Sequence, residues 1–94
     1  MENSYISKAR CVLAPGSSNQ IATNMKNLLL DEAREKKMSL AIKDLIVHSY
    51  PCKCVYSASG YVNNKEFEIV GKEEKLINAF IDIHNQIFDK YGRN

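Results

Sequence analysis

Alternation of hydrophobic and polar residues is clearest in residues 52–70. Two alternating segments flank the dipeptide Asn63-Asn64, and asparagine tolerates the left-handed backbone conformation that a two-residue turn requires. The pattern therefore predicts a β-hairpin in which Val62 pairs with Lys65. In that register one face carries Cys52, Cys54, Tyr56, Ala58, Gly60, Phe67 and Ile69, and the wet face carries Lys53, Ser57, Ser59, Tyr61, Glu66 and Glu68.

Two elements are predicted before the hairpin from the spacing of their apolar residues. Residues 5–13 alternate with a period of two and include β-branched and aromatic side chains, which predicts a strand. Residues 17–37 have apolar positions at helical spacing, and Ser17 lies three residues before Gln20, the spacing of a capping box at a helix N-terminus. The proline–glycine pair at 15–16 predicts the turn between them.

Residues 38–49 fit either a helix or a strand. Met38, Ile42 and Leu45 fall on one helical face, whereas the run LIVHSY is equally compatible with a strand. We favour a short helix that ends before Pro51, because the residue before a proline disfavours the helical conformation.

The spacing of apolar residues makes residues 72–91 the clearest predicted helix, and Gly92 is expected to end it. The apolar side chains of this helix span a wider arc of its surface than packing against one sheet would bury. The excess predicts a second partner, most simply another copy of the chain. We expect the oligomer interface to include Ile77, Ile81, His84 and Phe88.

The order β-α-(α)-β-β-α predicts one small α+β domain over residues 1–94. We expect a two-layer sandwich with a mostly antiparallel three-stranded sheet and helices on one face. The opposite face keeps Ile6, Val12, Val55, Tyr61 and Val70, which is rather apolar for a solvated surface. This face is a second reason to expect a homodimer or a larger assembly.

Composition and charge narrow the classes of function only slightly. The 94 residues are 45% hydrophobic and 26% charged, with a net charge of +2, which is ordinary for a globular protein. Lysine and arginine are spread along the chain, whereas proteins committed to nucleic acid usually show a clustered basic stripe. The N-terminus has no secretory signal and no apolar run is long enough for a membrane span, so we expect a cytoplasmic protein without membrane contact.

The stretch HSYPCKC, which begins at His48, gathers residue types that bind metals. A zinc site would take Cys11, His48, Cys52 and Cys54 as its ligands. However, the usual spacing of two residues between cysteines is absent, and the hairpin register directs both of its cysteines toward the core. We therefore expect reduced, buried thiols and no cofactor, with zinc as the alternative.

A second candidate site lies at the start of the first helix. Helix N-termini bind anions through free N–H groups, which makes Ser17, Ser18 and Asn19 candidate anion ligands. A serine at this position is also an ordinary helix cap. The chain shows none of the common motifs of nucleophilic or metal-dependent catalysis, so we do not expect an enzyme.

These features favour a non-enzymatic, homo-oligomeric binding or regulatory module that acts through protein–protein or small-ligand contacts. The alternative is a DNA-binding regulator, since the predicted order of elements partly resembles a winged helix-turn-helix. Segment 39–49 would be the recognition helix and the 53–70 hairpin the wing. Asp44 in the recognition segment and a nearly uncharged wing argue against it. The DNA contacts would come from Lys37, Lys43, His48, Asn63, Asn64 and Lys65.

Overall fold

The chain begins with a helix where a strand was expected. A computed structural model describes residues 4–13 and 17–92, and α1 spans Ser4–Val12. Ile6 and Ala9 are its buried residues, and their spacing of three places them on one helical face. The strand predicted from alternation is therefore wrong, because burial follows the helical spacing. The turn predicted at 15–16 lies outside the described residues.

The second helix, α2, spans Ser18–Glu35 and confirms the predicted helix. The Ser17 hydroxyl accepts a hydrogen bond from the backbone N–H of Gln20 at 3.2 Å, as the capping spacing predicted. Tyr5 of α1 donates a hydrogen bond to the Glu35 carboxylate, which raises the pKa of this tyrosine to about 12 and joins the two helices. The face of α2 that meets the core carries Ile21, Met25, Leu29, Glu32 and Ala33.

The favoured helix at residues 38–49 is also wrong, because this segment forms a strand. β1 spans Leu40–Tyr50. Leu45 and Val47 are buried and the residues next to them are exposed, which is the period of a half-buried strand. Lys37 has a φ of 58°, and this left-handed residue turns the chain from α2 toward β1.

The predicted hairpin is confirmed with its register. β2 spans Lys53–Val62 and β3 spans Lys65–Glu73, and they pair antiparallel with Val62 opposite Lys65. Asn63 and Asn64 have φ values of 51° and 67°, as expected for a two-residue turn with both central residues left-handed.

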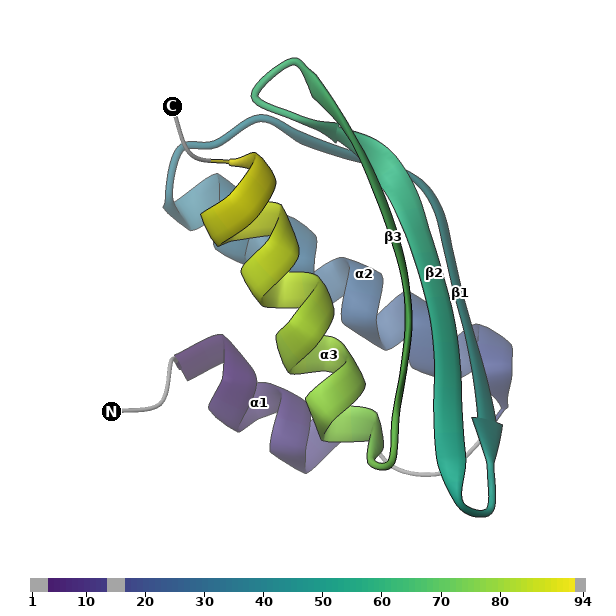
Figure 1. Ribbon diagram of the computed structural model, residues 1–94. Coiled ribbons are helices and arrows are strands. Elements are labelled where there is room, and N and C mark those ends of the chain that lie inside the picture. The colour runs from purple at the N-terminus through teal and green to yellow at the C-terminus, as the bar shows by residue number, and fades with distance from the viewer. Residues whose placement is uncertain (1–3, 14–16, 93–94) are drawn as a thin grey trace.

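The three strands form one antiparallel sheet in the order β1-β2-β3, and the helices lie together on one side of it (Figure 1). α2 and α3 contact the strands, and α1 packs on these two helices. The predicted α+β class, with a three-stranded antiparallel sheet and helices on one face, is confirmed. The strand beside β2 is β1 rather than residues 5–13. No helix in the described ranges is both long and apolar enough to cross a membrane.

The last helical segment starts later than predicted. α3 spans Leu76–Asn85 and continues as a π-helical segment, η1, over Gln86–Tyr91. β3 runs on through Gly71, where the Tyr56 ring packs so closely that a Cβ on this residue would lie 2.7 Å from the tyrosine hydroxyl oxygen. That hydroxyl donates to the Asp82 carboxylate and so links β2 to α3.

Candidate functional site

The described helices leave one side of the sheet uncovered (Figure 1). We call it the open face. Along each strand its residues alternate with buried ones, so every second side chain belongs to it. The open face consists of Asp44, Ile46, His48 and Tyr50 on β1, Lys53, Val55, Ser57, Ser59 and Tyr61 on β2, and Glu66, Glu68, Val70 and Lys72 on β3.

A β-bulge at Lys43 shapes one end of this face. The register between β1 and β2 shifts between Ile42 and Asp44. Across from the bulge stands Gly60, where a Cβ would lie only 2.0 Å from the carbonyl oxygen of Ala41. Gly60 therefore lets the β1 backbone approach β2 closely.

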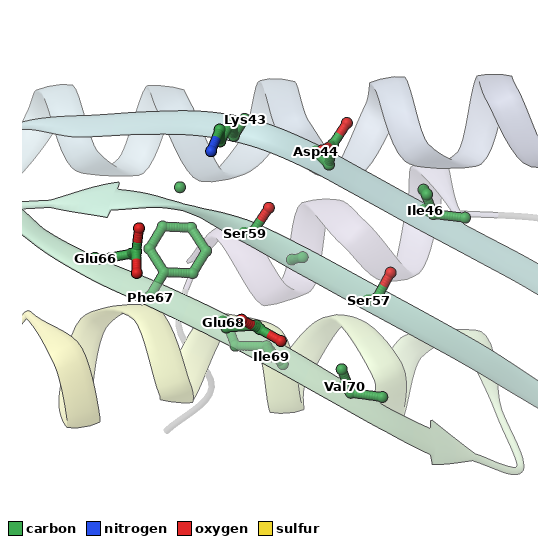
Figure 2. A pocket seen from close by; sticks show the side chains of 12 residues that line it. Lys43, Asp44, Ile46, Ser57, Ser59, Glu66, Phe67, Glu68, Ile69 and Val70 are labelled. Atoms are coloured by element: carbon green, nitrogen blue, oxygen red, sulfur yellow. The ribbon is translucent and has the colours of Figure 1, made fainter.

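Small side chains on the central strand leave a hollow in the open face (Figure 2). Ser57 and Ser59 occupy the middle of the face, while larger residues stand on the outer strands. The hollow has a volume of about 300 Å³. Its lining on the open face includes Lys43, Asp44 and Ile46 from β1 and Glu66, Glu68 and Val70 from β3.

Exposed hydrophobic side chains concentrate on the open face. Val70 is 71% exposed and Tyr50 is 51% exposed, and Ile46 and Tyr61 are exposed nearby. Among the described residues, the remaining exposed large hydrophobic side chain is Val12 on α1. Single exposed apolar residues are common on proteins, but a group on one uncovered face is typical of a contact surface.

Charges on the open face are separated along the strand direction. Acidic side chains lie toward the Asn63-Asn64 turn and basic ones toward the turn between β1 and β2. Glu73 and Glu74 follow at the rim of the basic end. The acidic end carries Asp44, Glu66 and Glu68 with Lys43 beside them, and the basic end carries His48, Lys53 and Lys72.

A second notable group is buried between α2 and α3. The Glu32 carboxylate lies 2.6 Å from Nε2 of His84 and 2.9 Å from the ammonium of Lys36. Glu32 is 1% exposed and His84 is 5% exposed. The His84 ring packs between Phe80 and Phe88. A glutamate–histidine pair has the residue types of acid–base chemistry, but this pair is closed off from solvent and joins the two helices.

Burial raises the pKa of Glu32, whereas the hydrogen bonds from His84 and Lys36 lower it more strongly, so its pKa lies below the ordinary 4.5. The carboxylate is therefore ionised at neutral pH. Its Oε1 atom has no donor among the described residues. The cluster depends on both His84 and Lys36, since a buried carboxylate without partners is strongly destabilising.

The four predicted metal ligands do not converge. Cys54 is buried, whereas His48 is exposed on the other face of the sheet. Cys52 is exposed in the turn before β2, and Cys11 is exposed on α1, so the expected burial is wrong for these two thiols. In the part of the chain that the structure describes, no group of three or more metal-binding side chains comes together.

The recognition helix required for DNA binding is not present, because segment 39–49 contains β1. Lys43 and His48 lie instead on β1, and Lys37 forms the turn before it. Asn63 is engaged within the chain: its Oδ1 accepts from Ser39 N at 3.1 Å, and its Nδ2 donates to the Gly92 carbonyl at 3.3 Å. Asn64 and Lys65 are exposed at the hairpin tip.

The remaining candidates have mixed positions. Ser17 caps α2, while Ser18 is half-buried and Asn19 exposed at the same helix start. His84 and Phe88 are buried within the chain, so the expectation that they meet a partner is wrong. The other two expected interface residues, Ile77 and Ile81, are half-buried against the core.

The open face was only partly predictable. The hairpin pattern by itself places Tyr61 and Val70 on an apolar outer surface. The contribution of β1 was missed, because Ile46 and His48 lie in the segment taken for a helix. The alternation of LIVHSY was the signal that pointed to them.

Comparison of the chain with protein-family models, with curated proteins and with solved structures finds no match. The geometry of the chain itself therefore carries the functional argument.

Proposed function

We propose that this protein is a non-enzymatic, homo-oligomeric binding or regulatory module that makes its protein contacts through the open face of its sheet. One observation carries the proposal: four of the five exposed large hydrophobic side chains in the described ranges share this uncovered face. Exposed apolar side chains gain free energy when a partner removes them from water, at about 25 cal/mol per Å². Ile46 and Val70 flank the hollow and are the expected anchors.

A binding role also fits the placement of the ionisable groups. The Glu32–His84 pair is buried and bound to Lys36, so it supports the fold rather than a reaction with a substrate. On the open face the charged side chains are exposed and separated, as in the polar rim of a protein interface.

Affinity capture from the source cell tests the proposal when variants of exposed valines on two different surfaces are compared. V70S removes an apolar anchor from the open face, and V12S removes an exposed valine from α1, away from the sheet. The wild type and V12S are expected to retain the same bound proteins, other copies of the chain included, and V70S to lose them. Equal capture by all three forms would show that the open face is not the binding surface.

A further inference from the structure

We infer that the open face binds the open face of a second copy of this chain, with the strands of the two copies running antiparallel across the interface. The inference rests on the proposed function and names its partner. It comes from the order of charged, apolar and small residues in the three central rows of the face, which is complementary to itself after a half-turn.

This order is described by rows, each of which contains the residues that lie opposite one another on β1, β2 and β3. Cross-strand pairing places Ile46, Ser57 and Val70 in one row across the middle of the open face. The neighbouring row toward the Asn63-Asn64 turn holds Asp44, Ser59 and Glu68, and the neighbouring row on the other side holds His48, Val55 and Lys72.

A two-fold axis that crosses the strands at the middle row brings opposite charges together. Each strand then faces its own counterpart in reverse direction, so Glu68 of one copy faces Lys72 of the other. On β1, Asp44 faces His48 of the second copy, whose ring N–H can donate a hydrogen bond to a carboxylate. Each contact occurs twice because the interface is symmetric.

The other face-to-face arrangement, with the axis parallel to the strands, is disfavoured. It would place β1 of one copy over β3 of the other, with each row facing the same row of the second copy. Asp44 of each copy would then face Glu68 of the other, so that carboxylates meet on both sides, and Lys72 would face His48. Charge therefore selects the antiparallel arrangement.

Side-chain size agrees with the same arrangement. Val70 faces Val70 of the second copy, and Ile46 faces Ile46. Both pairs lie beside the hollow over Ser57, which leaves space for these apolar side chains. Toward the ends, Tyr50 of one copy faces the small Ala41 of the other. Lys53 faces the ring of Tyr61, an arrangement suited to a cation–π contact.

The dimensions of the face set the expected strength. Three strands of about ten residues cover roughly 15 by 30 Å, or about 450 Å² on each copy. Interfaces of this size are at the lower end of specific complexes and are usually weak. The dimer is therefore expected to form reversibly, with a dissociation constant in the micromolar range.

Charge exchange on β3 provides the test. E68K places a lysine opposite Lys72 of the second copy, and K72E places a glutamate opposite Glu68. Within one chain, Glu68 lies across from Ser59 and Lys72 across from Val55, so neither change alters a directly opposed charge pair. Each single variant is expected to weaken the dimer about tenfold, since two attractive contacts become repulsive.

Sedimentation equilibrium over a range of concentrations measures the result. The double variant E68K/K72E should dimerise like the wild type, and an equimolar mixture of the two single variants should form a heterodimer that neither forms alone. Circular dichroism confirms that each variant is folded. A wild type that stays monomeric at millimolar concentration, or single variants that dimerise unchanged, would overturn the inference. In either case, loss of capture by V70S with retention by V12S would still support the open face as a binding surface for a different protein.

Discussion

Single residues in the interior decide how the helices meet, and Glu32 is the clearest case. Its carboxylate is fully buried and held by two partners, His84 and Lys36. The sequence predicted that His84 faces a partner copy. Its burial against Glu32 instead makes the stability of the single chain depend on pH.

E32Q is expected to lower the free energy of unfolding by about 3 kcal/mol at pH 7, because the change leaves His84 and Lys36 without the carboxylate. The folded-state pKa of Glu32 lies below its unfolded value of 4.5, so the stabilisation is fully present above pH 4.5 and is lost as the pH falls below it. Urea denaturation followed by circular dichroism should show the difference between wild type and variant shrinking below pH 4.5. D89N, a change at an exposed acid on η1, serves as the control. A constant difference from pH 7 to pH 3 would contradict this assignment.

Asn63 combines a strained backbone with two side-chain hydrogen bonds. N63A should lose about 2 kcal/mol of stability, because alanine disfavours the φ of 51° and also removes both bonds. N63G keeps a backbone suited to positive φ and should lose about 1 kcal/mol, the worth of the hydrogen bonds alone. Thermal unfolding of the three forms gives the ranking. If glycine were as damaging as alanine, backbone strain would have no part in the effect.

At the scale of elements, the packing of β1 against β2 depends on the close approach at Gly60. G60A is expected to destabilise the protein by at least about 3 kcal/mol, because the new Cβ would collide with a backbone carbonyl that cannot rotate away. S59A, the adjacent change on the open face, should stay within about 0.5 kcal/mol of wild type. Urea denaturation compares the two. Hydrogen exchange of the β1 amides should increase in G60A alone, and equal protection in both variants would argue against the bulge as the point of closest packing.

Elements with local signals were predictable from the sequence, and those set by tertiary packing were not. The asparagine pair defined the hairpin and its register, and the serine cap defined the start of α2, since both signals act within a few residues. Residues 5–13 and 38–49 are short segments whose apolar residues fit both helical spacing and the alternation of a strand. The local sequence therefore could not decide between helix and strand. Which structure each segment adopts depends on which of its side chains are buried in the core between α2 and the sheet.

At the scale of the molecule, the sheet has one side covered by helices and one side open. The apolar character of the open side follows from the alternation that includes Val55, Tyr61 and Val70 in the hairpin. The arrangement of polar and charged residues on this side could not be predicted from the hairpin alone. Asp44 and His48 belong to it because β1 is a strand and not the expected helix. The symmetry of the face is thus a property of the assembled sheet.

Cross-linking at the centre of the open face tests the self-complementary interface most directly. Ser57 lies in the row that faces its own copy, whereas Ser59, on the same strand and face, lies one row away from the axis. In a background where Cys11 and Cys52 are replaced by serine, S57C should form covalent dimers with a short bis-maleimide, and S59C should not. A mixture of S59C and V55C should restore cross-linking, because these positions face each other. Equal cross-linking of S57C and S59C, or of neither, would contradict the antiparallel face-to-face dimer.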